Sequence, residues 1–309
     1  MYKYKIKVLL SSYNGEAFID KQIQSILNQK GVEIAILIRD DGSTDKTPSI
    51  LSQYAKKSCV EVVYGENVGF KRSFSSLVKL AASDNYVYDF YAFADQDDLW
   101  YPNKLLEECR SLSVFDSNKP NVVVCNSDII DENGIPSRLF RNFDPLYTNY
   151  NVYFSTDFQG CSMVFNRCAL EKYNLFHITD YCHDNWLFLT CAMLGNVTNI
   201  NKPLFGYRIH SHNAIGVCHD STIISRIKKS IRYWFSSNKL VRREIVQLLF
   251  EHWNQDIDKD RYVFIYHYLN YRKNLYSKFW LMFNPHSFRM GDGTYRPFTF
   301  WRNLLFNKY

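Results

Sequence analysis

The first hundred residues alternate between short apolar runs and amphipathic stretches. Four runs rich in apolar residues are predicted to be strands: residues 6–12, 34–39, 60–64 and 86–94. Three stretches between them repeat their apolar residues at helical spacing: residues 17–29, 47–57 and 71–83. This alternation predicts an α/β fold with a Rossmann-like, mainly parallel sheet flanked by crossover helices.

Further elements follow beyond residue 100. Helices are predicted at residues 102–114, 168–173 and 186–193. Strands are predicted at residues 122–126, 159–165, 197–200 and 203–210. Residues 136–157 are irregular and aromatic, and we expect them to form a loop over the crevice of the sheet.

Polar residues gather where three of the predicted strands end. Ser11 and Ser12 end the first strand, Asp40-Asp41 follow the second, and Asp95-Gln96-Asp97-Asp98 follow the fourth. Because ligands bind at the carboxyl ends of parallel strands, we expect these clusters to converge on one crevice. The three carboxylates of residues 95–98 repel one another unless a cation lies among them, and Mg²⁺ or Mn²⁺ prefers such ligands. A solvated acidic turn explains the spacing of these carboxylates equally well.

The composition is that of a globular protein. Apolar residues make up 46% of the 309 residues and aromatic residues 17%, enough for the core of one or two domains. No apolar run reaches the roughly 20 residues of a transmembrane helix, and the apolar segment at residues 8–10 is too short for a signal peptide. The eight cysteines are scattered without a Cys-x-x-Cys pair, which favours reduced thiols in a cytoplasmic protein and disfavours zinc.

Charge is distributed unevenly along the chain. Residues 222–309 hold 16 basic and 6 acidic residues, a net charge of +10, whereas the remainder has a net charge of −4. Residues 223–235 carry apolar side chains on one helical face with cations interleaved, and residues 240–253 and 261–283 are predicted to be further amphipathic helices. Residues 298–306 are apolar with isolated cations. Such a region suits the surface of an anionic membrane, although the same aromatics also suit docking on the body of the protein. No nucleic-acid-binding module accompanies the basic residues, so we expect no nucleic-acid partner.

Seven motifs stand in order along the chain. They are Ser12-Tyr13-Asn14-Gly15, Arg39-Asp40-Asp41-Gly42-Ser43-Thr44-Asp45, Asn67-Val68-Gly69, Asp95-Gln96-Asp97-Asp98-Leu99-Trp100, Gly160-Cys161-Ser162-Met163-Val164-Phe165-Asn166, His183-Asp184-Asn185-Trp186 and Tyr207-Arg208-Ile209-His210. Together they resemble a family 2 glycosyltransferase with the GT-A fold, in the rhamnosyltransferase-like branch of bacterial surface polysaccharide synthesis. The resemblance covers residues 5–216. It implies a catalytic domain at residues 1–216 and a helical C-terminal region at residues 217–309.

The resemblance implies an inverting, metal-dependent transfer of a sugar, rhamnose or another hexose, from a nucleotide-diphosphate donor to a saccharide acceptor. Asp97 matches the main metal ligand, with Asp95 and His210 as further contacts to Mn²⁺ or Mg²⁺. Asp184 matches the catalytic base, although an Asp at a helix start is also favoured as an N-cap. The residues implied in binding the nucleotide or the donor are Ser11, Ser12, Tyr13, Asp41, Lys71, Arg72, Asp95, Gln96, Gln159, Gly160 and Arg208.

One position departs from the pattern. Many relatives carry Asn where this chain has Phe74, so a donor contact from this position is not expected. The acceptor implied by the resemblance is a lipid-linked saccharide of O-antigen or capsular polysaccharide synthesis, met by a cytoplasmic enzyme that lies peripherally on the inner face of the membrane. The alternative is a nucleotide-sugar-binding assembly protein without transfer activity. Because both Asp97 and Asp184 are present, the sequence favours the enzyme.

Overall fold

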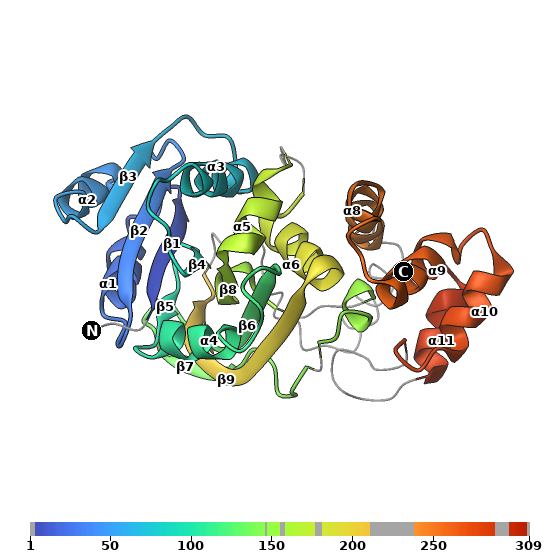
Figure 1. The fold of residues 1–309 in the computed structure, drawn as a ribbon. Coiled ribbons are helices and arrows are strands. Elements are labelled where there is room, and N and C mark those ends of the chain that lie inside the picture. The colour runs from blue at the N-terminus through green and yellow to red at the C-terminus, as the bar shows by residue number, and fades with distance from the viewer. Residues whose placement is uncertain are drawn as a thin grey trace. The chain divides into compact units, whose positions relative to one another are not determined.

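The structure is a computed structural model that describes residues 4–145, 147–154, 158–176, 181–210, 238–287 and 297–307. The chain divides into two compact units (Figure 1). The α/β unit comprises Met1–Pro145 and Asp157–Arg208, and the helical unit comprises Leu146–Thr156 and Ile209–Tyr309. The predicted boundary between residues 216 and 217 lies outside the described residues, as does the predicted amphipathic helix at residues 223–235.

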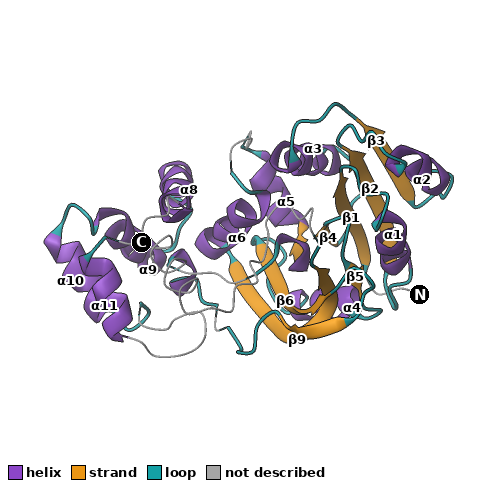
Figure 2. Cartoon of the chain, turned by 180° about the vertical axis from the view of Figure 1, so that it is seen from behind, coloured by secondary structure: helices purple, strands orange, loops and turns teal. Residues whose placement is uncertain are grey.

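The first half of the sheet in the α/β unit is parallel, as predicted. Its strands run in the order β3-β2-β1-β4, with bounds Val60–Tyr64, Glu33–Asp40, Lys5–Ser12 and Phe90–Ala94. The second half continues from β4 in the order β8-β6-β9-β5, with bounds Met163–Asn166, Asn121–Ile130, Asn196–Arg208 and Leu99–Trp100. β8 is antiparallel to both β4 and β6, while β6 and β9 are parallel. The α/β class with a curled, mostly parallel sheet is therefore confirmed (Figure 2).

Helices cover the sheet on both faces. Those of the α/β unit are α1 Ile19–Leu27, α2 Thr47–Tyr54, α3 Phe70–Ala82, α4 Lys104–Leu112, α5 Arg167–Asn174 and α6 His183–Leu194. α1 buries Ile19, Ile23 and Ile26, which recur at helical spacing, against the strands. β4 is buried over its whole length, because helices cover both of its faces.

Three details of the α/β unit differ from the sequence predictions. The two strands predicted at residues 197–200 and 203–210 are one strand, β9, whose pairing with β6 shifts register between Asn126 and Asp128. Pro203 suggested a break between two strands, but in the structure β9 continues through it and the irregular pairing accommodates the proline. Residues 160–162 form a 3-10 turn, η2, ahead of β8 rather than the start of a strand. Residues 136–139 form β7, which pairs with β6.

The helical unit also differs from prediction. The predicted helix at residues 261–283 is two helices, α9 Lys259–Asn270 and α10 Leu275–Phe283, because the Asn274 side chain accepts hydrogen bonds from the backbone of Tyr276 and Ser277 and caps a new helix. α8 Asn238–Trp253 agrees with prediction, and Pro297–Leu305 form a further helix, α11. The described part of residues 136–157 is less irregular than predicted, because it contains β7 and a 3-10 turn, η1 Asn151–Tyr153, which packs against α8. A place of this segment over the crevice stays a prediction. Among the described residues, no helix is both long enough and apolar enough to span a bilayer.

Strand register brings the polar clusters to one edge of the sheet. Ser12 pairs with Asp40 across β1 and β2, and Leu10 pairs with Ala94 across β1 and β4. The residues that follow, Asp41 and Asp95, therefore leave the same edge on either side of β1. The convergence expected from the sequence is confirmed for these three strand ends.

Candidate active site

The acidic cluster lies in the turn between β4 and β5. Asp98 is fully buried, and its Oδ1 accepts a 3.3 Å hydrogen bond from the backbone N–H of Arg208. Its Oδ2 is buried without a hydrogen-bond partner in the described part of the chain. A carboxylate oxygen of Asp95, a carboxylate oxygen of Asp98 and the Sγ of Cys161 all lie within 4.8 Å of one another. The turn is therefore a partly buried anionic site, which contradicts the alternative of a solvated acidic turn.

Burial and mutual repulsion raise the pKa values of this cluster. Desolvation, followed by the charges of Asp97 and Asp184, raises the pKa of Asp95 to about 7. Desolvation and the charges of Asp97 and Asp95 raise the pKa of Asp98 well above its usual value. Near neutral pH Asp95 is therefore partly protonated, and a cation bound beside it favours loss of that proton.

The donor set fits a hard divalent cation. Carboxylate oxygens are the ligands that Mg²⁺ and Mn²⁺ prefer, and the unpartnered Oδ2 of Asp98 leaves acceptor capacity in the site. The Cys161 thiol adds no thiolate, because burial raises its pKa well above the usual range. Of the predicted metal ligands, Asp95 lies in the cluster and Asp97 acts electrostatically on it. His210 lies two residues beyond the end of β9, and its contact with a metal stays a prediction.

Arg208 lies behind the cluster, in the core. Its side chain is buried, its Nε donates to the Asp97 carbonyl, and its Nη1 donates to the carbonyls of Asp131 and Glu132, each at 2.7 Å. Its guanidinium also lies 4.7 Å from the centre of the Phe18 ring. A donor contact from Arg208 stays a prediction, but the geometry shows a positioning residue that holds the backbone of the acidic turn.

Asp184 lies in the first turn of α6, close to the acidic cluster. The N-cap of α6 is Cys182, so the N-cap alternative for Asp184 is wrong. The carboxylate Oδ1 accepts a 2.6 Å hydrogen bond from the backbone N–H of Asn185. A methyl group at Gly160 would lie 3.3 Å from Asp184 Oδ2, so Gly160 packs directly on this carboxylate. The candidate base and the candidate sugar-binding glycine are therefore in contact.

The ring of His183 is held behind Asp184 by two aromatic rings. It stacks on Phe74 at 3.8 Å and meets Phe93 edge-to-face at 4.6 Å. Burial lowers the pKa of His183 to about 4, so its imidazole is neutral at physiological pH. Phe74, the departure noted in the sequence, is a core residue that supports this ring.

Two carboxylates lie at the strand end that the sequence predicts to bind the nucleotide. Asp40 accepts hydrogen bonds from Ser12 Oγ at 3.1 Å and from the Ser43 side chain and backbone. Asp41 accepts from the backbone N–H groups of Val68 at 3.0 Å and Gly69 at 2.8 Å, and Arg39 forms a buried ion pair with it. These bonds tie the second motif to the Asn67-Val68-Gly69 turn and orient both carboxylates.

The loop after β1 is fixed by Gln96. Its amide accepts from the Tyr13 backbone N–H at 2.8 Å and donates to the Tyr13 carbonyl at 3.0 Å, so the fourth motif holds the first in place. The Tyr13 side chain is exposed. Ser11 Oγ lies 2.6 Å from Ser73 Oγ on α3. These contacts place the predicted nucleotide residues of β1, α3 and the acidic turn around one edge of the sheet.

Lys71 and Arg72 lie in the first turn of α3, which begins after Gly69 with φ of 82°. Cations at a helix N-terminus oppose the helix dipole, and this first turn has no acidic residue. The arrangement therefore costs stability unless an anion is bound there. At the other end of the site, Gln159 shares a hydrogen bond of 3.1 Å with Ser127 on β6.

Sequence reasoning missed the structural role of Arg208 and the contact of Cys161 with two carboxylates. The four residues that end β9, Phe205-Gly206-Tyr207-Arg208, show no periodicity that distinguishes a buried arginine from a ligand-facing one. Gly160, just before Cys161, was the one available signal of close packing here, because a glycine in a strand-like segment often marks a place where other groups approach the backbone closely.

The fold and this site define a glycosyltransferase of the GT-A type. Solved structures support the fold: TarS 1-349 of S. aureus in complex with UDP-GlcNAc matches with a TM-score of 0.56 at 16% identity, covering 98% of this chain and 80% of that chain. The mannosyltransferase PcManGT from Pyrobaculum calidifontis, in complex with GDP-Man and Mn²⁺, matches with a TM-score of 0.50 at 13% identity over 100% of this chain and 89% of that chain.

The model of the family described as "Glycosyl transferase family 2" matches residues 7–178, and the chain belongs to this family. Among its relatives is the dTDP-rhamnosyl transferase RfbG of Shigella flexneri, 29% identical over 77% of this chain and 83% of the relative. Another is the UDP-Glc:alpha-D-GlcNAc-diphosphoundecaprenol beta-1,3-glucosyltransferase WfgD of Escherichia coli, 27% identical over 64% of this chain and 74% of the relative. The family resemblance found in the sequence is confirmed.

Proposed function

We propose that this glycosyltransferase moves rhamnose or another hexose, with inversion, from a nucleoside-diphosphate donor to a saccharide acceptor in bacterial surface polysaccharide synthesis. One observation carries the proposal. The Asp184 carboxylate lies beside Gly160 and within electrostatic range of Asp95, which supports a base close to an anionic metal site. The relatives RfbG, a dTDP-rhamnosyl transferase, and WfgD, a glucosyltransferase, support a rhamnosyl or glucosyl donor.

The residues divide the reaction between them. The Asp184 carboxylate accepts the proton of the acceptor hydroxyl as its oxygen attacks the anomeric carbon of the donor sugar. The bond from that carbon to the diphosphate oxygen breaks, and the diphosphate leaves with the electron pair. Lys71 and Arg72, at the N-terminus of α3, stabilise the negative charge on the leaving group.

We assign the metal to Asp97 and Asp95, with His210 as a further contact and Mn²⁺ or Mg²⁺ as the ion. When bound, the cation neutralises charge on the diphosphate as the bond to the sugar breaks. Asp98 supports this site from its buried position, and Arg208 holds the backbone of Asp97. Tyr13, Ser11, Ser12 and Asp41 line the nucleotide pocket, and Gln96, Gln159 and Gly160 line the donor-sugar end.

We place the reaction at the cytoplasmic face of the inner membrane, with the enzyme bound peripherally through its C-terminal region. The acceptor is then a lipid-linked saccharide. The relative WfgD acts on a diphosphoundecaprenol-linked sugar, which supports such an acceptor. The excess of basic residues in residues 222–309 supports an anionic surface.

The test is a transfer assay on the purified chain. Nucleoside-diphosphate sugars, beginning with dTDP-rhamnose and UDP-glucose, are offered with Mn²⁺ or Mg²⁺ and a diphosphate-lipid-linked saccharide, and released nucleoside diphosphate and glycosylated product are measured. We expect Asp184→Asn to keep donor affinity and to lower turnover by roughly a hundredfold or more. Donor binding without product for every acceptor offered would support the alternative of a binding protein without transfer activity. Normal turnover in Asp184→Asn would remove this residue as the base.

A further inference from the structure

Two helices of the helical unit display an apolar surface that the fold leaves open. On α10 the side chains of Leu275, Tyr276, Phe279 and Phe283 share one face, and on α11 those of Phe298 and Leu305 do so, followed by Phe306. Each of these seven side chains is between 53% and 79% exposed. We call this surface the α10–α11 face.

The inner sides of α10 and α11, opposite this face, are packed in the helical unit. α10 buries Ser277 and Leu281 on its other side, and Trp280 stacks on His267 with ring centres 4.2 Å apart. α11 buries Phe300 and Leu304. The apolar residues on the outside are therefore not part of a frayed helix, because the inner sides of both helices are packed.

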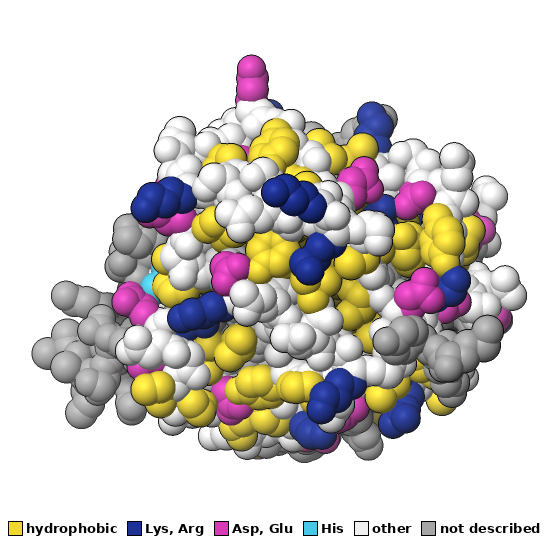
Figure 3. Space-filling view, turned by 90° about the vertical axis from the view of Figure 1, so that its left-hand side faces the viewer, with side chains coloured by type: hydrophobic (Ala, Val, Ile, Leu, Met, Phe, Trp, Pro, Cys, Tyr) yellow, Lys and Arg dark blue, Asp and Glu magenta, His cyan; other side chains and the backbone are white. Residues whose placement is uncertain are grey.

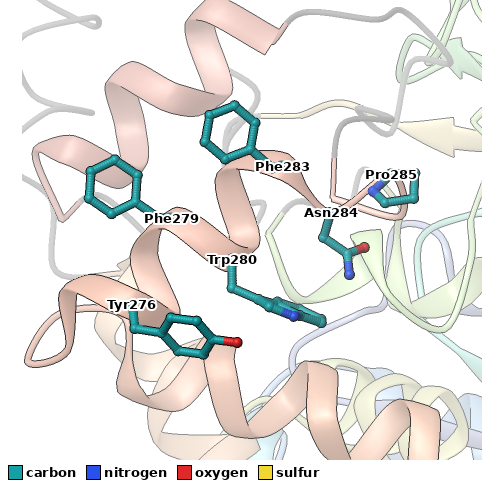
Figure 4. A pocket seen from close by; sticks show the side chains of 6 residues that line it. All are labelled: Tyr276, Phe279, Trp280, Phe283, Asn284 and Pro285. Atoms are coloured by element: carbon teal, nitrogen blue, oxygen red, sulfur yellow. The ribbon is translucent and has the colours of Figure 1, made fainter.

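The two helices form one continuous surface. Trp301 Nε1 donates to the Met282 carbonyl at 2.7 Å, and Lys278 Nζ donates to Asn307 Oδ1 at 3.0 Å, which ties α11 to α10. The Trp301 ring lies 5.8 Å from that of Phe283 and 5.7 Å from that of Phe298. Beside it, α10 residues Tyr276, Phe279, Trp280 and Phe283, with Asn284 and Pro285, line an open hollow of about 440 Å³ (Figure 4).

The charges on these two helices and the residues next to them in the sequence have one sign. The described residues 271–287 and 297–307 include four cations, Arg272, Lys273, Lys278 and Arg302, and no Asp or Glu. In contrast, the face of the molecule in Figure 3 intersperses basic and acidic side chains. Exposed apolar residues of the α/β unit, such as Val87, Val114 and Leu175, belong to separate segments and form no such pair of stripes.

We propose that the α10–α11 face binds the surface of an anionic phospholipid bilayer, with its aromatic side chains at the level of the lipid headgroups. Aromatic rings favour this interfacial region, and Lys and Arg beside them reach the phosphates. A second copy of the chain is a poorer occupant, because pairing this face with itself brings like charges together. The proposal rests on the proposed function, since it supplies the contact that brings the enzyme to a lipid-linked acceptor.

Vesicle binding tests the face without any donor or acceptor. The full chain is sedimented with vesicles of phosphatidylcholine alone and of equal parts phosphatidylcholine and phosphatidylglycerol. We expect binding to the anionic vesicles. The variant Phe279→Ser/Phe283→Ser/Phe298→Ser loses at least about tenfold in affinity, because three exposed rings no longer enter the interface. The matched control Val87→Ser/Val114→Ser/Leu175→Ser, which removes equally exposed apolar groups of the α/β unit, binds as the wild type does.

A variant that removes cations tests the electrostatic part of the proposal separately. Lys273→Gln/Lys278→Gln/Arg302→Gln removes three of the four cations, and we expect it to lose about tenfold or more in affinity for anionic vesicles. Wild-type binding by the Phe variant overturns the proposal, as does a wild type that binds neither vesicle. A wild-type dimer that the Phe variant converts to monomers also overturns it, in favour of a second copy.

Transfer to a water-soluble acceptor separates this proposal from the proposed function. The Phe variant is expected to keep that activity and to lose transfer to acceptor embedded in vesicles. If the wild type transfers to no acceptor, the proposed function fails, while vesicle binding still decides the role of the α10–α11 face.

Discussion

Gly160 and Asp184 are in direct contact: a methyl group on the glycine would lie 3.2 Å from the Asp184 Cβ and 3.3 Å from its Oδ2. The contact joins the turn before β8 to the first turn of α6. Because Gly160 has no side chain, nothing at this position crowds the carboxylate. The space available to the proposed base therefore depends on a residue 24 positions earlier in the chain.

Replacing Gly160 with Ala is expected to displace the Asp184 carboxylate by a few tenths of an ångström. We expect kcat to fall by about tenfold while donor affinity changes little, since small misplacements of a base cost rate rather than binding. The measurement is steady-state kinetics alongside donor titration. Ser162→Ala, in the same turn, is the control and is expected to keep kcat within about threefold of wild type. Equal losses in both variants would mean that the turn, rather than the contact, was disturbed.

The raised pKa of Asp95 predicts how stability depends on pH. Its folded-state pKa of about 7 exceeds the usual value of 3.8, so the folded protein holds a proton that the unfolded chain has released. Stability is therefore lost as pH rises from the unfolded-state pKa through the folded-state pKa. Without metal, we expect the melting temperature to be lower at about pH 8 than at about pH 6, and Mn²⁺ to raise it more at the higher pH.

Asp95→Asn removes this titration and serves as the control. Its metal-free melting temperature is expected to change less with pH across the same range, and the added Mn²⁺ to have a smaller effect. A wild type whose metal-free stability increases over this range would contradict the raised pKa. Calorimetry at several pH values, with and without Mn²⁺, decides the question.

Local patterns in the sequence were sufficient to predict the α/β class and the shared edge of the strand ends. Each apolar run and each helical period depends on neighbouring residues, and β1, β2 and β4 follow from such runs. The motifs at residues 11–13, 40–41 and 95–98 reach one edge because parallel strands end there. These predictions needed no knowledge of distant contacts.

Other features depended on contacts between distant residues and could not be predicted locally. Arg208 resembles a ligand-binding residue in its motif, yet its partner Asp97 lies 111 residues away and takes the guanidinium into the core. Aromatic residues around η1 resemble an active-site loop, but Tyr153 and Phe154 pack against Tyr268 of α9 in the helical unit. In both cases the residue type suggested a function, but the distant partner that fixes its actual role could not be found from the local sequence.

The carbonyl contacts of Arg208 predict a stability cost that lysine cannot restore. Arg208→Met leaves the carbonyls of Asp97, Asp131 and Glu132 without this donor, and we expect a loss of about 3 kcal/mol in the free energy of unfolding. Arg208→Lys recovers little, because one ammonium group cannot span three acceptors in the fixed geometry of a guanidinium. Urea unfolding provides the measurement, and the exposed Arg138→Met is the control with a change within about 0.5 kcal/mol. A lysine variant as stable as the wild type would show that charge alone is required.

Lys104 and Glu108 on α4 form a fully buried ion pair 2.8 Å apart, and the lysine ammonium also lies 4.4 Å from the centre of the Trp100 ring. Lys104→Met leaves Glu108 buried without its cation, and we expect a loss of about 3–5 kcal/mol in unfolding free energy. Burial already raises the pKa of Glu108, and loss of the lysine raises it further, so the variant weakens as pH rises. Lys104→Met/Glu108→Leu is expected to recover most of the loss, whereas Lys202→Met, which breaks the exposed pair with Glu107, changes stability by less than about 1 kcal/mol. A double variant no more stable than Lys104→Met would show that packing of the lysine stem, rather than the unpaired carboxylate, sets the cost.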